Sequence, residues 1–133
     1  PAAAPPKALT PPEPLMNHYL AVFTGYPATN AASGWDALSE PERNARIQAG
    51  MQAWGAWMTT HAAQIVVAGG PIGKTLRVDP QGVSATQNEI CGYVVVSADS
   101  HEAAAKLFEN HPHFSIFPGE AVEVMVCLPV PGA

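Results

Sequence analysis

Short apolar segments alternate with helical repeats along the chain from residue 17 onward. The segments 17–24, 64–68, 90–96 and 121–128 are rich in aliphatic and aromatic residues and are bounded by turn-forming or polar residues, which is typical of β-strands. The shorter segments 75–78 and 83–86 flank the sequence Asp-Pro-Gln-Gly, which predicts a β-hairpin.

The region between the first two strands carries a helix-start signal. Ser39 followed by Glu42 matches a capping box, and the proline between them is tolerated in a first turn. Beyond this cap, apolar residues recur at three- and four-residue spacing and predict one apolar stripe. The stripe consists of Ile47, Met51, Trp54, Trp57 and Met58.

A second capping pattern, Asp99 with Glu102, precedes an alanine-rich helix after the strand 90–96. Because Pro112 disfavours helical geometry in the residue before it, the helix is predicted to end at His111.

The resulting order is strand, helix, strand, hairpin, strand, helix, strand. This order predicts an α+β fold of the ferredoxin-like βαββαβ type with an inserted hairpin, in which both helices cover one face of an antiparallel sheet. Residues 1–15 are rich in proline and alanine, lack periodicity and are expected to form an extension. The folded domain is therefore assigned to residues 16–133.

Both faces of the predicted sheet are apolar. In the first strand Leu20 and Val22 alternate with Tyr19, Ala21 and Phe23, and the later strands alternate in the same way. A monomeric antiparallel sheet with helices on one face normally has a polar second face. We therefore expect a homodimer in which a second copy covers that face.

Composition narrows the functional classes. The 133 residues are 47% hydrophobic and 13% charged, with a net charge of -5. The acidic balance argues against nucleic-acid binding, and no apolar run is long enough to suggest a membrane span. Cys91 and Cys127 lie in apolar strands and are interpreted as reduced core residues. We expect a cytoplasmic protein.

His111 is the strongest candidate for chemistry. An imidazole at a helix C-terminus is stabilised when protonated and titrates near neutrality, which suits a general acid or base. The alternative is a histidine that caps the last carbonyls and packs. His113 is a second candidate for the same site. A metal site would need a third ligand from His18, His61 or His101, none at a recognised spacing, and no metal is expected.

Several other residues are candidates for ligand contact. Met51 and Trp54 lie on the helix stripe, where core packing is the alternative to an apolar cleft floor. Tyr93 and Glu123 are polar groups in apolar strands, with core and rim positions as alternatives. Gly70 belongs to a glycine turn that allows close backbone approach and could form a cleft wall. That turn does not match a phosphate-binding loop, because Ala68 stands where glycine is required.

A resemblance to a known family rests on five segments, which are residues 35–40, residues 67–73, residues 92–104, His111-Pro112 and Val122-Glu123-Val124. Together these segments resemble the YCII-related domain family. The resemblance spans roughly residues 17–129 and implies a dimeric α/β barrel with a cleft between the first helix, the sheet and the loop after the second helix. The Asp-Gly-Pro-Phe motif of one branch is absent, and the His–Asp pair of another is not reproduced, since His111 occupies the aspartate position.

The sequence thus predicts a small-molecule-binding protein that functions as a homodimer without a cofactor. One hypothesis is an enzyme that uses histidine acid–base chemistry in an apolar cleft. The alternative is a non-catalytic ligand-binding or protein-interaction module.

Overall fold

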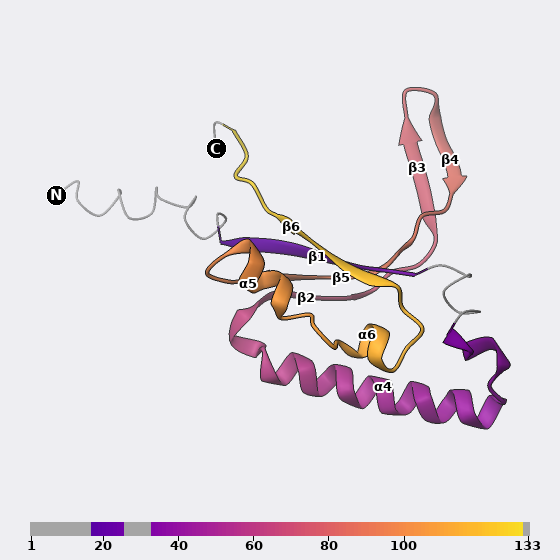
Figure 1. Ribbon diagram of the computed structural model, residues 1–133. Coiled ribbons are helices and arrows are strands. Elements are labelled where there is room, and N and C mark those ends of the chain that lie inside the picture. The colour runs from indigo at the N-terminus through magenta and orange to yellow at the C-terminus, as the bar shows by residue number, and fades with distance from the viewer. Residues whose placement is uncertain (1–16, 26–32, 132–133) are drawn as a thin grey trace.

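A computed structural model describes residues 17–25 and 33–131. Its main sheet contains β1 (His18–Thr24), β2 (Ile65–Pro71), β5 (Ile90–Ser97) and β6 (Ala121–Val126), in the order β2-β5-β1-β6 (Figure 1). Every neighbouring pair is antiparallel. This is the strand order of a ferredoxin-like βαββαβ fold, so the predicted α+β fold class is confirmed.

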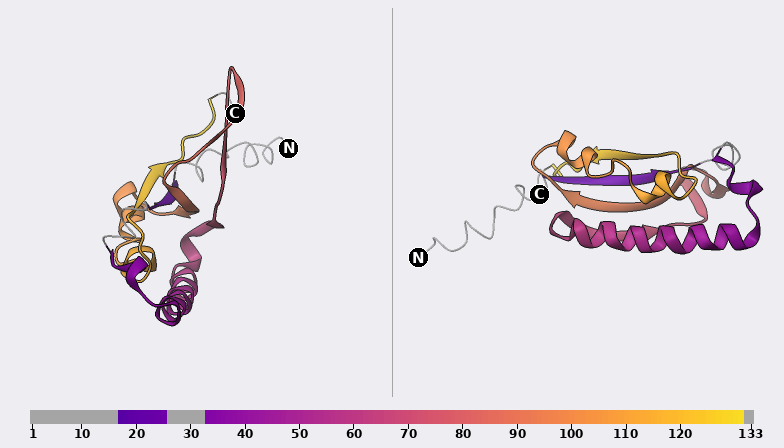
Figure 2. Two further views of the ribbon diagram at one scale, coloured as in Figure 1. Left: turned by 90° about the vertical axis from the view of Figure 1, so that its right-hand side faces the viewer. Right: turned by 60° about the horizontal axis from the view of Figure 1, so that its bottom comes forward.

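The helices all lie on one face of this sheet (Figures 1 and 2). The long helix α4 (Glu40–Thr60) begins at the predicted capping box, where the Ser39 side chain accepts from the Glu42 backbone N–H and the Glu42 carboxylate accepts from Ser39. Short 3-10 turns, η1 (Trp35–Ala37) and η2 (Ala62–Gln64), flank α4. α5 (His101–Lys106) and α6 (Pro112–Ser115) complete the helical layer.

The second helical region differs from its prediction at both ends. Its cap is Ser100 rather than Asp99, because the Ser100 hydroxyl accepts from the Ala103 N–H at 3.0 Å. α5 ends at Lys106, and Asn110 then adopts a positive φ of 60°. His111 therefore does not end the helix; it is the N-cap of α6, with proline at the first position, where a missing N–H costs no hydrogen bond.

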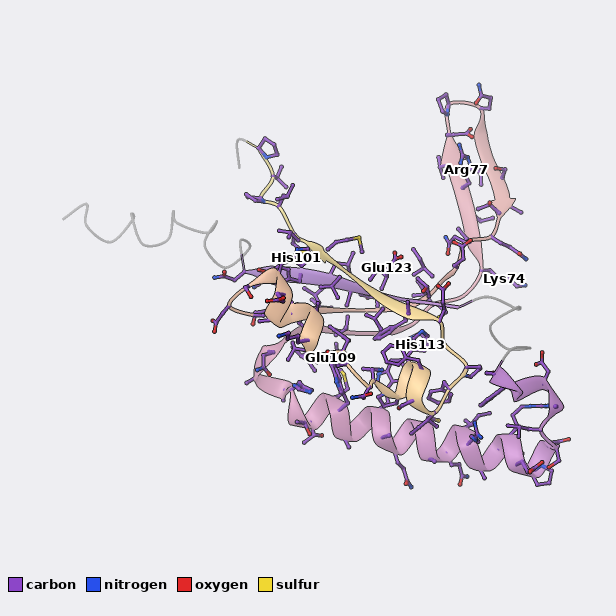
Figure 3. The ribbon with its side chains drawn as sticks, in the orientation of Figure 1. Lys74, Arg77, His101, Glu109, His113 and Glu123 are labelled. Carbon is purple, nitrogen blue, oxygen red and sulfur yellow. The ribbon has the colours of Figure 1, made fainter. Side chains whose placement is uncertain are left out.

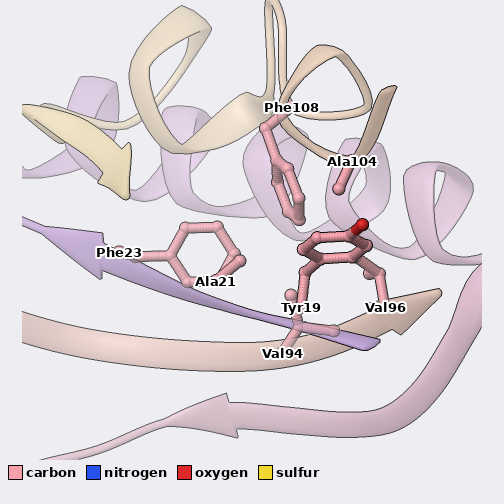
Figure 4. Close-up of a cluster of buried hydrophobic side chains, with 7 residues drawn as sticks. All are labelled: Tyr19, Ala21, Phe23, Val94, Val96, Ala104 and Phe108. Atoms are coloured by element: carbon pink, nitrogen blue, oxygen red, sulfur yellow. The ribbon is translucent and has the colours of Figure 1, made fainter. Parts of the chain in front are cut away.

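A compact aromatic and aliphatic core lies between the sheet and the helices (Figure 4). Successive inward-facing positions of β1 and β5 meet the start of the second helical region, and Trp54 and Trp57 of α4 pack against them. The buried members are Tyr19, Ala21, Phe23, Val94, Val96, Ala104 and Phe108.

The opposite face of the sheet, here called the open face, has no helix over it (Figures 1 and 2). The strand register places Leu20 between Val95 and Met125, and Val22 between Tyr93 and Glu123. On β2, Val67 pairs with Val95. The described strands therefore carry apolar residues on both faces, as the alternation predicted. The homodimer inferred from that pattern stays a prediction.

β3 (Thr75–Asp79) and β4 (Gly82–Thr86) form the predicted hairpin and make a separate two-stranded sheet. The strand before it is longer than predicted. β2 continues through Gly69 and Gly70 to Pro71 because irregular pairing with β5 accommodates both glycines. The predicted extension, residues 1–15, lies outside the described residues. Among the residues described, no helix has the length and apolarity needed to cross a bilayer.

Candidate functional site

A cavity of about 520 Å³ opens between α4 and the helix-covered face of the sheet. We call it the apolar cavity, because none of its lining residues is an acid, a lysine or an arginine. Side-chain heteroatoms come from Met51, Trp54, Cys91 and His113. The complete lining is Phe23, Ile47, Met51, Trp54, Gly55, Pro71, Cys91, Gly92, His113 and Phe117.

Small residues create this space. Gly55 lies within α4, and a Cβ built there would meet no atom within 4 Å. On the sheet side, a Cβ at Gly92 would come within 3.1 Å of the Phe23 ring, so glycine lets that ring lie close to β5. Gly50 is buried beneath Phe117, whose ring occupies the position of a side chain. Gly55 therefore leaves space open on the helix side of the cavity, whereas Gly92 and Gly50 let aromatic rings of the wall lie close to the backbone.

His113 forms part of the cavity wall and is almost fully buried, at 5% exposure. Its Nε2 lies 2.8 Å from the Thr24 carbonyl, so Nε2 donates and carries the proton. Burial lowers the pKa of His113, against the opposing effect of the backbone carbonyls of Thr24 and Ala121. At neutral pH the ring is uncharged, with its lone pair on Nδ1.

His111 is fully buried and is not among the residues that line the cavity. Its Nδ1 accepts from the His113 backbone N–H at 3.0 Å, which places the proton on Nε2. Within the described chain, Nε2 is buried without a hydrogen-bond partner. Trp54 and Trp57 contact the imidazole edge to face, with ring centroids 4.5 and 4.7 Å away.

The predicted titration of His111 near neutrality is wrong. The pKa of His111 is lowered to about 4. Burial is the largest cause, and charge repulsion from His113 and His61 adds to it. The prediction assumed a helix C-terminus, where a cation is favoured. The structure instead encloses the ring among aromatic side chains at a helix N-cap, where neither a solvent-facing proton nor a charge is accommodated.

The structure brings only some of the predicted site residues together. Met51, Trp54 and His113 line the cavity, whereas His111 contacts the Trp54 ring but is not part of the lining. Tyr93, Glu123 and Gly70 share the open face, on the other side of the sheet. Figure 3 shows His113 between the sheet and α4, and Glu123 on β6.

Sequence reasoning missed the sheet side of the cavity. Phe23, Cys91 and Gly92 lie on strands whose alternation was read as core, and Pro71 was read as a strand stop. Gly55 and Phe117 were not singled out either. Gly55 was the signal in the sequence that could have indicated the cavity. A glycine that interrupts the apolar stripe of a helix leaves space beside its large neighbours.

The prediction that Cys91 is a buried core residue is wrong. Cys91 lines the cavity and is exposed, while Cys127 is half-buried; both are free. Desolvation raises the pKa of the Cys91 thiol, and its Sγ lies 3.3 Å from the Phe23 carbonyl. The thiol is therefore protonated at neutral pH and is a weak nucleophile. The described residues contain no group of three or more His, Cys, Asp or Glu side chains that could hold a metal ion.

No family model matches the chain, and no curated protein matches it. A solved structure with a similar arrangement is that of 5-chloro-2-hydroxyhydroquinone dehydrochlorinase from Burkholderia phenoliruptrix AC1100, in complex with 2,5-dihydroxybenzoquinone. The two chains are 19% identical, the alignment covers 80% of this chain and 89% of that one, and the TM-score is 0.45. At this identity and score the likeness assigns neither a family nor an activity, so the YCII resemblance stays a prediction.

Proposed function

We propose that the protein binds a small, uncharged, ring-shaped organic molecule in the apolar cavity. The observation that carries this proposal is a cavity of about 520 Å³ whose lining includes aromatic rings but no acid, lysine or arginine. Its volume falls within the range of pockets that hold small ligands.

The wall chemistry defines the ligand further. A charged ligand would lose its hydration without gaining a counter-charge, because His113 is neutral and Cys91 is protonated. A flat ring instead gains from the Trp54 and Phe23 side chains, which meet edge to face with centroids 4.9 Å apart. An uncharged aromatic or quinonoid ring is thus the class of ligand that fits.

Filling the cavity from Gly55 tests the proposal. Gly55→Leu should stabilise α4, since glycine inside a helix costs up to about 1 kcal/mol relative to good helix formers. The same side chain enters the open space beside Gly55 and should weaken binding of 2-naphthol at least about tenfold, because displacing about 60 Å² of apolar contact costs about 1.4 kcal/mol. Isothermal calorimetry and chemical denaturation measure the two effects.

Gly55→Ala is the matched control. It provides at least the same helix stabilisation, because alanine is the best helix former, but it adds only one methyl group, so 2-naphthol binding should stay close to that of the unmodified protein. Equal binding by the alanine and leucine variants would show that the probe binds elsewhere. Failure of the unmodified protein to bind 2-naphthol or comparable uncharged rings would contradict the proposal itself.

An acid–base enzyme is the second candidate, and one observation favours it. His113 is a neutral imidazole in the cavity wall with its proton fixed on Nε2 by the Thr24 carbonyl, which leaves Nδ1 as the basic atom. Such a base can remove a C–H proton next to a carbonyl group of a bound ring. The fully buried His111 accepts a hydrogen bond from the His113 backbone N–H and so helps to position the turn that carries His113.

Deuterium incorporation tests this second candidate. An uncharged, enolisable cyclic ketone incubated with the protein in D₂O should gain deuterium faster than in buffer, as measured by mass spectrometry. His113→Gln should abolish the gain, while His101→Gln, which changes an exposed histidine of α5, should retain it. Exchange at the buffer rate with a ligand shown to bind would favour the non-catalytic binding module.

A further inference from the structure

Among the described side chains that line the apolar cavity, His113 is the one that carries a strong hydrogen-bond acceptor. The other heteroatoms differ in kind or strength, because the Trp54 indole can only donate and the sulfurs of Met51 and Cys91 are weak acceptors. The Cys91 thiol is also engaged locally, with its Sγ 3.3 Å from the Phe23 carbonyl. The side chains of the wall therefore present one strong acceptor within an otherwise apolar surface.

Hydrogen bonds and close packing fix the orientation of His113. Its Nε2 donates to the Thr24 carbonyl at 2.8 Å, and the same carbonyl accepts from the Glu120 N–H at 2.9 Å. The His113 backbone N–H donates to Nδ1 of His111 at 3.0 Å, and the His113 carbonyl accepts from the Gly119 N–H at 2.8 Å. A Cβ at Gly119 would collide with Cε1 and Nε2 of the ring, so the Gly119 backbone covers that edge. The ring cannot turn without breaking these contacts, and Nδ1 is held in one place.

Nδ1 of His113 is the ring nitrogen left for a ligand. No described residue forms a hydrogen bond with it. In the described part of the chain, the fully buried polar side-chain atoms without a partner are Arg43 Nε and His111 Nε2, so Nδ1 of His113 keeps accessible surface. His113 is 5% exposed and lines the cavity, which makes this nitrogen part of the cavity wall. A purely apolar ligand would leave it unpaired, at a cost in free energy.

We propose that the cavity selects rings that carry a hydroxyl group and that this hydroxyl donates a hydrogen bond to Nδ1 of His113. The inference rests on the proposed function and narrows its ligand class to uncharged phenols. The hydroxyl proton pairs with the single strong acceptor, while the ring packs on Trp54 and Phe23. A ring ether lacks the donor, and a phenolate both lacks the donor and brings a charge into an apolar site.

Three probes that share one ring system test the inference. 2-Naphthol can donate and accept, 2-methoxynaphthalene can only accept, and naphthalene can do neither. In equilibrium dialysis at neutral pH, 2-naphthol should bind about tenfold more tightly than 2-methoxynaphthalene, because the ether leaves a buried acceptor unpaired. Naphthalene should not bind more tightly than 2-naphthol, although it is the most apolar of the three.

His113→Phe removes the acceptor but keeps a ring in the cavity wall. The Thr24 carbonyl retains the Glu120 N–H as a partner in this variant. The preference for 2-naphthol over 2-methoxynaphthalene should fall from about tenfold to near unity. His101→Phe is the matched control, because the Nε2 of His101 also contacts a backbone carbonyl, that of Val124 at 2.7 Å, but lies outside the cavity. The control should retain the full preference.

¹⁵N NMR of the histidine rings gives an independent answer that does not depend on a substitution. 2-Naphthol should shift the Nδ1 resonance of His113, since that nitrogen accepts the new hydrogen bond, whereas 2-methoxynaphthalene should leave it nearly unchanged. An Nδ1 resonance that does not respond to bound 2-naphthol would overturn the role of His113. A preference that survives in folded His113→Phe protein would overturn it as well.

The probe series separates failure of this inference from failure of the proposed function. Equal binding of 2-naphthol and 2-methoxynaphthalene by the unmodified protein would overturn the selection for a hydroxyl group, while the apolar cavity would stand as a binding site. Absence of binding by all three probes would instead refute the proposed function, and the inference with it.

Discussion

Acidification from pH 6.5 to pH 4 should destabilise the protein by about 3 kcal/mol through His111 alone. The pKa of the buried ring is lowered to about 4, against about 6.5 in an unfolded chain. The folded state thus binds the proton more weakly, so the stabilisation is complete above pH 6.5, declines through this window and is exhausted near pH 4. His113, whose pKa is also lowered, acts in the same direction. Urea denaturation at a series of pH values measures the decline.

His111→Asn isolates the contribution of the ring. Asparagine does not titrate in this range, and its side-chain oxygen can accept from the His113 N–H as an N-cap, so the local hydrogen bond is retained. We expect a lower free energy of unfolding at pH 7, because the aromatic contacts are reduced, but a much flatter pH dependence. His101→Asn, which removes an exposed imidazole, should keep the steep dependence. Equal slopes in all three proteins would show that His111 is not the titrating group.

Gly69→Ala should reduce the free energy of unfolding by at least about 3 kcal/mol. Gly69 has a φ of 60°, where a residue with a Cβ pays about 1–2 kcal/mol. Its Cβ would also collide with the Tyr93 carbonyl oxygen, a backbone atom of β5 that moves only if the strand pairing shifts. Because Pro71 and Gly92 pair next to this point and line the apolar cavity, ligand binding should weaken as well.

Gly73→Ala is the control for this effect. Gly73 follows the same strand, but its backbone lies outside the positive-φ region and a Cβ there meets no atom within 4 Å. Chemical denaturation should place this variant within about 0.5 kcal/mol of the unmodified protein. A Gly69→Ala variant as stable as Gly73→Ala would mean that β2 does not approach β5 as the structure shows.

The element order could be predicted because each signal is local. The capping box at Ser39, the alternation along β1 and the turn between β3 and β4 all depend on residues a few positions apart, and all are confirmed. The second helical region was predicted less well. The helix expected to reach His111 ends at Lys106, Asn110 adopts a positive φ, and a further short helix, α6, begins at Pro112, beyond the predicted end.

The candidate site depended on contacts between distant segments. Periodicity placed Met51 and Trp54 on one helical face, and both line the apolar cavity. Periodicity did not reveal that Tyr93 and Glu123 face away from α4, because alternation defines two faces without saying which one the helices cover.

The sequence by itself determined the α+β class, the ferredoxin-like order and a sheet that is apolar on both faces, since these follow from spacing along the chain. Only the tertiary structure decided which histidine meets the cavity. His111 and His113 are two residues apart, yet the turn at Pro112 buries the first among aromatic rings and turns the second to the cavity wall. The pKa values and roles of these side chains depend on burial by β1 and α4, which lie far away in sequence.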